Sequence, residues 1–284
     1  MVNKYQSLRT IFDKKKYDRF PCNDIEAWNN FPEYHHIYNK LWIAESQGVP
    51  CGPMGIYPEN YPVIFKPVIN LFGMSKGIKI INNDNDYDAN VSDGVFWEEF
   101  LTGTHRCVDL VVDHGKIIFS SCWISIPGKQ GTFDHHISDP YYVIPDHILE
   151  WIQTFFDEYR GCLNFETIDG IIIECHLRLN GDSQLYNETF AEELNQFLKG
   201  ETDKINYKID KKYLIPIFVN KNYQKALDEQ KVLSLCDKYD VLSIFFDNIN
   251  SKYQSEYMSR IIIFDIKDLE KGLELRNIII GEYL

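Results

Sequence analysis

The chain lacks a long apolar run and a surplus of positive charge. No stretch approaches the roughly 20 apolar residues needed to cross a bilayer, and residues 1–20 carry charges where a secretory leader would have an apolar core. Lysine and arginine number 29 against 42 aspartates and glutamates, a net charge of −13. A general nucleic-acid binder needs a basic face to neutralise phosphates. We therefore expect neither membrane insertion nor general nucleic-acid binding, whereas a local basic pocket for a nucleotide stays open.

Paired cysteine motifs are missing as well. The seven cysteines are odd in number and scattered, with no Cys-x-x-Cys among them. In a reducing compartment such cysteines stay thiols, so neither a disulfide framework nor a zinc site is predicted. Together with the missing leader, this pattern predicts a cytoplasmic protein. Since no cysteine has a visible base partner, a thiol nucleophile is not favoured.

The 284 residues, 44% hydrophobic and 25% charged, suffice for one large domain or two to three small ones. Residue patterns predict mixed helix and strand. We expect helices over 38–48, 145–159, 187–198, 223–238 and 267–273. We expect strands over 61–67, 78–81, 95–101, 213–219, 241–247, 259–265 and 276–283, and hairpins over 106–125 and 163–179. Residues 82–94 are predicted to be an acidic turn region, residues 127–140 a polar loop, and the charged stretch 200–212 a domain boundary.

The first segment of chemical interest combines a lysine in an apolar strand with a glycine-rich loop. Lys66 lies within Pro-Val-Ile-Phe-Lys-Pro, and a buried strand rarely carries a lysine unless its ammonium has an anionic partner. The loop that follows contains Gly73, Ser75, Lys76 and Gly77, whose backbone N–H groups suit phosphate oxygens. It lacks the Walker pattern. Taken alone, the segment fits an edge lysine beside a flexible turn about twice as well.

The second segment is the strand Val-Phe-Trp-Glu-Glu-Phe-Leu, which carries Glu98 and Glu99. Adjacent residues of a strand point to opposite faces, so one of these carboxylates can face a cleft. An amphipathic edge strand explains the same pattern equally well, and the segment carries no function by itself.

The third segment places acids on two paired strands. Glu174, His176, Arg178 and Asn180 alternate, so we expect all four on one face of a strand, with Glu166 on the preceding strand across an Asp-Gly turn. Two carboxylates with a further nitrogen or oxygen ligand suit Mg²⁺ bridging polyphosphate oxygens. A nearby arginine can stabilise charge on a transferring phosphoryl group. A solvated polar sheet face is the alternative, which the preceding Ile-Ile-Ile run makes less favourable.

The order of these segments, over roughly residues 38–198, resembles the ATP-grasp superfamily. The resemblance implies an α+β ATP-grasp fold in which two α+β subdomains clamp Mg·ATP. It divides the chain into an arm (1–37), an N-terminal subdomain with the phosphate loop (38–94), a C-terminal subdomain with the metal site (95–199) and a small α+β extension (213–284). The family's usual Rossmann-like N-terminal domain is not expected in the roughly 37 residues before the match, and residues 213–284 are expected to supply a missing wall.

The resemblance also implies roles for single residues. Its ATP-binding positions match Lys40, Lys66, Gly73, Ser75, Lys76, Gly77, Glu98, Glu99, Phe100, Leu101 and His105. Its Mg²⁺ carboxylates match Glu166 and Glu174, His176 stands at the further ligand position, and Asn180 is the alternative metal ligand to His176. Arg178 matches the catalytic arginine that steadies the acyl-phosphate transition state. Two positions depart from the pattern. His105 stands where glutamate is frequent, and His176 stands where asparagine is usual.

The implied reaction is attack of a carboxylate on the γ-phosphate of ATP, which yields an acyl phosphate that an amine or similar nucleophile captures. The partners would be a small-molecule or peptide carboxylate and that nucleophile, with ATP and Mg²⁺ as cofactors. The alternative is an ATP-grasp-like nucleotide-binding or structural protein without ligase activity, which the two histidine departures favour slightly.

Overall fold

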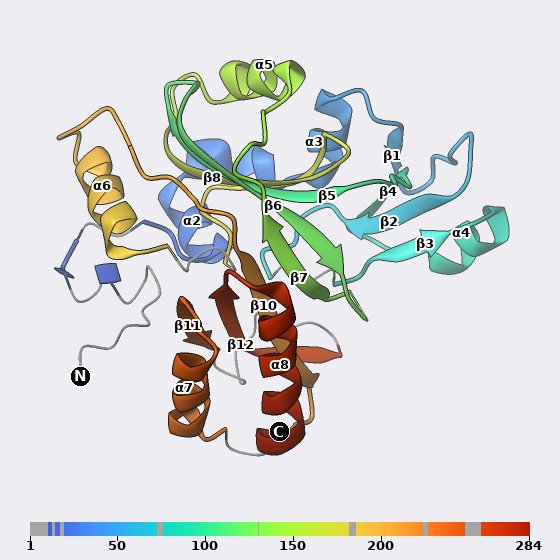
Figure 1. Cartoon of the computed structure of the whole chain (residues 1–284). Helices are drawn as coiled ribbons and strands as arrows, with labels where there is room; N and C mark the ends of the chain where they lie inside the picture. Colours follow the sequence, from blue (N-terminus) through green and yellow to red (C-terminus); the bar gives the residue numbers. More distant parts are fainter. Residues whose placement is uncertain are drawn as a thin grey trace. The chain divides into compact units, whose positions relative to one another are not determined.

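The computed structural model describes residues 11–12, 15–17, 20–72, 76–129, 131–181, 186–223, 227–247 and 257–284 (Figure 1). The chain divides into two compact units. Unit 1 comprises Met1–Phe20, Ile118–Tyr142 and Asn180–Leu284, and unit 2 comprises Pro21–Ile117 and Val143–Leu179. Each unit has its own packed interior. The functional subdivision drawn from the sequence stays a prediction.

Unit 2 contains a small antiparallel sheet in the order β1-β4-β2-β3. Its strands are β1 (Cys51–Pro53), β2 (Val63–Pro67), β3 (Lys79–Ile81) and β4 (Val95–Glu99). One apolar cluster of this sheet joins Val63, Phe65 and Trp97 to Tyr87 of helix α4 (Asp84–Asn90). This packing fixes β2 and β4 side by side, so that polar residues on their other face share one environment.

A second set of strands in unit 2 pairs β5 (His105–Asp113) with β8 (Arg160–Ile168), and β8 with β9 (Ile171–His176), both antiparallel. The predicted helix over 145–159 is observed as α5 (Asp146–Phe155), with Ile148 and Ile152 buried. Three short helical segments complete the unit: α2 (Asp24–Asn30), the 3₁₀ helix η1 (Pro32–Tyr38) and α3 (Lys40–Ser46).

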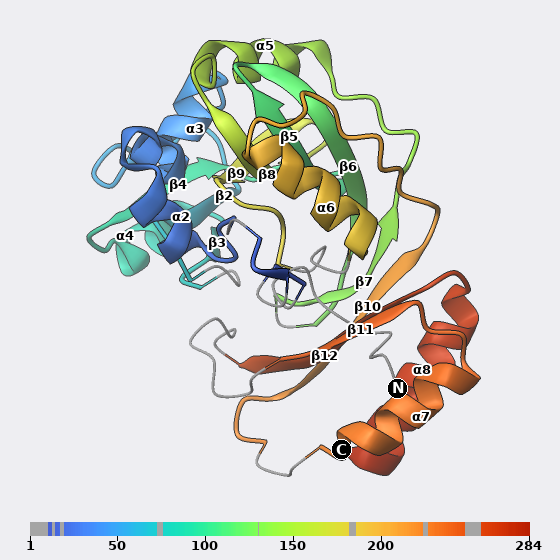
Figure 2. The same cartoon turned by 90° about the vertical axis from the view of Figure 1, so that its left-hand side faces the viewer.

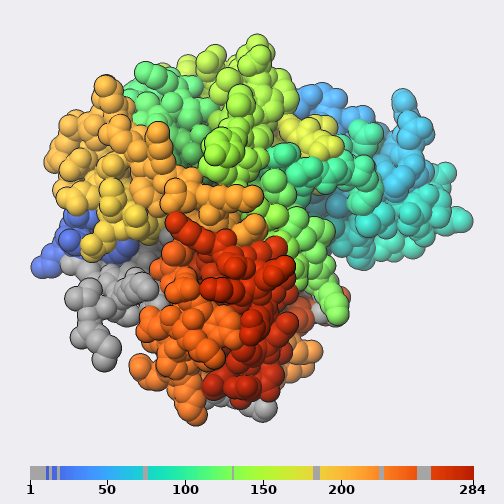
Figure 3. All heavy atoms as spheres, in the orientation of Figure 1, coloured from blue at the N-terminus to red at the C-terminus, as the bar shows by residue number. Residues whose placement is uncertain are grey.

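Unit 1 holds the antiparallel order β11-β12-β10-β7, continued by β6. Its elements are β6 (Lys116–Pro127, from Ile118 on), β7 (Phe133–Ser138), α6 (Glu188–Leu198), β10 (Tyr213–Asn220), α7 (Glu229–Lys238), β11 (Ser243–Phe246), β12 (Met258–Ile266) and α8 (Leu269–Tyr283). Helices α7 and α8 run side by side against β10 and β12 (Figure 2). In the space-filling view their orange and red atoms form one continuous surface (Figure 3).

Three sequence predictions of secondary structure away from the candidate site are wrong. The acidic turn region contains α4, because Asn83 caps it by accepting from the Asp86 N–H and Tyr87 anchors it in the apolar cluster. The polar loop contains β7, whose backbone pairs with β6 and β10. The strand expected over 276–283 is the second half of α8, where burial of Leu275 and Ile279 continues the helical spacing. Among the described residues, no helix is both long enough and apolar enough to cross a membrane.

Replacing Gly272 by alanine is expected to lower the free energy of unfolding by about 1–3 kcal/mol. A Cβ atom there would overlap the side chains of Ile215 and Ile266, against which α8 packs. Gly281 lies in the same helix with no atom within 4 Å of the added Cβ, so its alanine variant should gain up to about 1 kcal/mol. Urea unfolding of both variants measures the difference, and equal stabilities would contradict the close packing.

Candidate functional site

Two carboxylates face each other across the β8–β9 hairpin. Glu166 is directly opposite Glu174 in the strand register. The hairpin turns through Asp169 and Gly170, whose φ angles of 47° and 87° suit the two-residue turns that preserve strand twist. Like charges placed opposite each other destabilise a sheet. Each carboxylate therefore needs its own positive or polar partner.

Each carboxylate has such a partner within unit 2. Lys40, the first residue of α3, places its Nζ 2.9 Å from Glu174 Oε2 and is buried. His105, the first residue of β5, places its Nε2 2.9 Å from Glu166 Oε2. Burial alone would lower the pKa of His105, but its hydrogen bond to Glu166 and the charge of that carboxylate outweigh burial and raise it. The same contacts outweigh burial at Glu166 and lower the pKa of its carboxyl.

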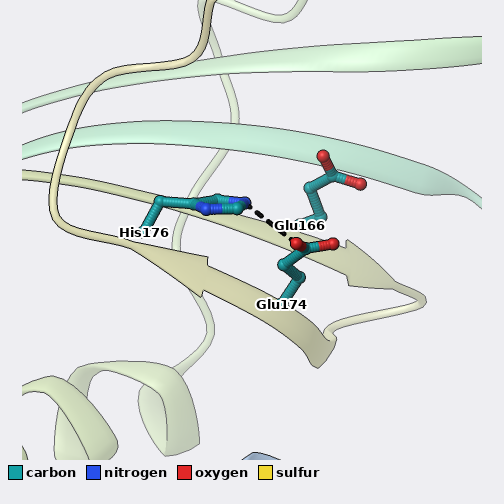
Figure 4. Close-up of side chains that lie close together, drawn as sticks. All are labelled: Glu166, Glu174 and His176. Carbon is teal, nitrogen blue, oxygen red and sulfur yellow. Dashed lines mark ion pairs between the residues drawn. The ribbon is translucent and has the colours of Figure 1, made fainter. Parts of the chain in front are cut away.

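His176 completes a group of three possible metal ligands (Figure 4). Its Nε2 lies 3.4 Å from Glu174 Oε1, and one ligand atom from each of Glu166, Glu174 and His176 lies within 4.8 Å of the others. Adjacent ligands of a cation bound at about 2.1 Å are about 3 Å apart, so the group fits one divalent cation. The two carboxylates suit Mg²⁺, whereas the imidazole suits transition metals better.

A buried aspartate contacts the second ring nitrogen of His176. Asp24 accepts a hydrogen bond from His176 Nδ1 at 2.9 Å and two from Arg178, whose Nε and Nη2 each lie 2.8 Å from a carboxylate oxygen. Burial would raise the pKa of Asp24, but Arg178 and His176 outweigh burial and hold it well below its usual range. The same ion pair outweighs burial at Arg178 and raises the pKa of its guanidinium.

The sequence reasoning missed Asp24 and misplaced Arg178. Asp24 follows Asn23, which caps α2 by accepting from the Glu26 N–H, so an acid there is explained by helix capping alone. Strand β9 ends at His176, so the prediction that Arg178 and Asn180 continue its face is wrong. The chain bends after His176, and the bend turns the arginine toward Asp24.

Lys66 and Glu98 form a second, deeply buried pair. Because Lys66 is opposite Phe96 and Ile64 is opposite Glu98, the two charged residues are diagonal neighbours on one face of β2 and β4. Lys66 Nζ lies 2.7 Å from Glu98 Oε2 and donates to the Ile173 carbonyl at 3.3 Å. Burial is the largest influence on both groups and lowers the pKa of Lys66 and raises that of Glu98.

The Ile173 contact links the two clusters, since Ile173 immediately precedes Glu174 on β9. The structure therefore brings together seven of the predicted residues within unit 2: Lys40, Lys66, Glu98, His105, Glu166, Glu174 and His176. This arrangement presents two buried lysines beside three possible metal ligands. Two ammonium groups and a divalent cation are the complement of a polyphosphate.

The remaining residues predicted to bind ATP or metal are not part of this group of seven. Glu99 is exposed, and its backbone N–H bonds the Pro50 carbonyl, while the Phe100 N–H bonds that of Pro62. Leu101 is half-buried. Lys76 lies over the Phe72 ring, and Gly77 has a φ of 75°. Gly73 and Ser75 lie outside the described residues, and Asn180 belongs to unit 1.

No protein-family model matches the chain, and no curated protein sequence matches it. Solved structures do match it. The chain is similar to an L-amino acid ligase from Bacillus licheniformis, with a TM-score of 0.59, 13% identity, and coverage of 97% of this chain and 76% of that one. It is also similar to N5-carboxyaminoimidazole ribonucleotide synthetase from Thermotoga maritima, with a TM-score of 0.54, 14% identity, and coverage of 94% and 76%.

A third similar structure is the biotin carboxylase domain of 2-oxoglutarate carboxylase from Hydrogenobacter thermophilus, in complex with MgADP, ADP and bicarbonate. Its TM-score is 0.51 at 14% identity, over 86% of this chain and 67% of that one. These likenesses show that the chain has the ATP-grasp fold, as the sequence predicts. At such identities they establish the fold alone.

Proposed function

We propose that the protein is a divalent-cation- and ATP-dependent ligase that activates a carboxylate as an acyl phosphate for capture by an amine or similar nucleophile. The proposal rests on one observation within one compact unit: Lys40 contacts Glu174 of the ligand group, and Lys66 contacts the carbonyl of Ile173, the residue before Glu174. The ATP-grasp fold supports the choice of ATP as the nucleotide, because one of the similar structures contains MgADP.

The proposed roles follow from the contacts. Lys66 and Lys40 neutralise phosphate oxygens, and their present partners Glu98 and Glu174 hold both side chains in place until the nucleotide arrives. Glu166, Glu174 and His176 hold the cation, with Mg²⁺ as the predicted one. That cation supplies charge neutralisation to the polyphosphate and orients it. Catalysis then rests on positioning and electrostatics, with no covalent enzyme intermediate.

Arg178 fits this scheme differently from the family role. Its Nε and Nη2 are both committed to Asp24, and its Nη1 donates to the Leu179 carbonyl. These contacts support a positioning role behind His176. A role at the transferring phosphoryl group, which the resemblance implies, requires Arg178 to exchange Asp24 for substrate oxygens.

The alternative, a nucleotide-binding protein without ligase activity, is favoured by the histidines at positions 105 and 176. Calorimetric titration of the purified protein with ATP, with and without Mg²⁺, tests nucleotide binding. Release of ADP in the presence of a library of small carboxylates and amino acids tests ligation. If ATP binds in a cation-dependent way but no ADP is formed with any of these carboxylates, the result would favour a nucleotide-binding protein without ligase activity.

Replacing Glu166 by glutamine is expected to weaken cation-dependent ATP binding by about 1.5–3 kcal/mol, because one charged ligand is lost. This variant is cleaner than Glu174→Gln, since its partner His105 can lose a proton, whereas Lys40 would be left buried without its partner. Glu188→Gln is the control, because Glu188 is an exposed glutamate of α6. Unchanged ATP affinity in calorimetry with excess Mg²⁺ would refute the assignment.

A further inference from the structure

The histidine of the ligand group is held as metal-binding histidines are held. His176 is almost fully buried, and its two ring nitrogens point at different neighbours. Nδ1 faces Asp24 at 2.9 Å, and Nε2 faces Glu174 Oε1 at 3.4 Å, toward the carboxylates of the group (Figure 4). A histidine that ligates a metal through one nitrogen usually donates the N–H of the other to a carboxylate, which fixes the ring and raises its basicity.

Asp24 assigns the proton on His176. An ionised carboxylate can only accept hydrogen bonds, so the atom that faces it, Nδ1, carries the hydrogen. A neutral ring then has its lone pair on Nε2, on the side of Glu166 and Glu174. Arg178 donates a hydrogen bond to each oxygen of Asp24 at 2.8 Å, and this two-point contact fixes the orientation of the carboxylate. The chain of contacts runs from Arg178 through Asp24 to a fixed imidazole.

Each of the two carboxylate ligands also has a basic side chain as a partner. Lys40 contacts Oε2 of Glu174, and Oε1 of the same carboxylate is the atom near His176. His105 contacts Oε2 of Glu166. The group therefore offers two carboxylate oxygens and one imidazole nitrogen in fixed orientations. Mg²⁺ demands oxygen ligands, whereas first-row transition dications gain from an imidazole.

We propose that His176, oriented by Asp24 and Arg178, makes this site prefer a first-row transition dication, with Mn²⁺ as its probe, over Mg²⁺. The inference rests on the proposed function, because it names the cation of the same site. Asp24 and Arg178 are positioning residues, and His176 is the selective ligand. An oxygen donor at position 176 would remove the preference, since amide oxygen and carboxylates together form the all-oxygen set that suits Mg²⁺.

The test uses the whole protein and Mn²⁺ alone, followed by electron paramagnetic resonance, with Mg²⁺ as competitor. We expect the spin-echo spectrum of the wild type with Mn²⁺ to show coupling to a directly bound nitrogen, and the ratio of Mn²⁺ to Mg²⁺ affinity to be about tenfold higher in the wild type than in His176→Asn. His176→Asn should lose that coupling and about tenfold in Mn²⁺ affinity while Mg²⁺ affinity changes little. Asp24→Asn should weaken Mn²⁺ binding by about 10–100-fold.

Asp134→Asn is the matched control. Asp134 makes the same kind of contacts in unit 1, to His135 Nδ1 at 2.8 Å and to Arg276 at 3.0 Å, so it should leave Mn²⁺ binding unchanged. The nitrogen coupling is measured on the wild type, so it decides the question even where a variant folds poorly.

The outcomes separate the inference from the proposed function. Mn²⁺ binding without nitrogen coupling, or the same ratio of Mn²⁺ to Mg²⁺ affinity in the wild type and in His176→Asn, overturns the inference while the ligase proposal stands on cation-dependent ATP binding. A wild type that binds neither cation, with or without ATP, overturns both.

Discussion

Replacing Lys66 by methionine is expected to lower the free energy of unfolding by about 3–5 kcal/mol, because the carboxylate of Glu98 is then left buried without a partner. The side chains of Lys66 and Glu98 are only 7% and 4% exposed, so water cannot replace the lost ammonium. Urea unfolding at neutral pH measures the loss.

The double variant Lys66→Met/Glu98→Met should recover most of this stability, since removing both charges also removes the cost of burying them. The loss of unfolding free energy caused by Lys66→Met should be smaller in acid than at neutral pH. Glu98 has a folded pKa raised above its unfolded value, so its protonated form favours folding below the unfolded pKa, and that contribution is lost as the pH rises through the folded pKa.

Lys79→Met serves as the control, because Lys79 lies exposed on β3 of the same sheet and bonds Asn90. Its effect should stay within about 0.5 kcal/mol. A Lys66→Met protein as stable as this control would contradict the buried pair, and so would a double variant no more stable than the single one.

Replacing Arg178 by methionine should lower the free energy of unfolding by a similar amount, about 3–5 kcal/mol at neutral pH, because His176 is then the one ion-pair partner left to Asp24 among the described residues. The stability of Arg178→Lys should lie between those of the wild type and Arg178→Met, because lysine keeps the positive charge but cannot form the bidentate contact with the carboxylate. Arg160→Met is the control. Its partner Asp113 is partly exposed, and such pairs contribute about 0–1 kcal/mol.

The Arg178 effect should depend on pH with a definite sign. The folded pKa of Asp24 is depressed, so Asp24 contributes stability above its unfolded pKa of about 3.9 and loses it as the pH falls toward the folded value. The stability difference between wild type and Arg178→Met should therefore shrink in acid. A difference that stays constant from neutral pH into acid would show that Arg178 acts through packing.

The strand content of the site and several of its residues were predictable from the sequence. Alternation and the Asp-Gly turn predict that Glu166 and Glu174 lie on the two strands of one hairpin. A two-residue turn alone would place Glu166 opposite Ile173, and the register shift between Glu166 and Thr167 places it opposite Glu174 instead. A lysine within an apolar strand demands an acidic partner, but the sequence did not identify Glu98 as that partner, which the pairing of β2 with β4 supplies. The order of these segments carried the ATP-grasp resemblance.

Local patterns failed where long-range packing decides the backbone. Residues 276–283 have apolar spacing that fits a strand, yet they continue α8 because Leu275 and Ile279 are buried against the sheet of unit 1. The polar segment around Phe133–Ser138 has little strand character of its own, and it becomes β7 because β6 and β10 offer backbone partners on both sides.

The sequence by itself determined the acidic, lysine-bearing chemistry and the strands that carry it, since both follow from residue type and short-range periodicity. The tertiary structure alone decided which charges neutralise one another. Asp24 lies more than 150 positions before Arg178, and it meets His176 and Arg178 only because α2 packs where β9 ends. No spacing rule connects residues so far apart in the chain, and their contact is set by how the elements between them pack.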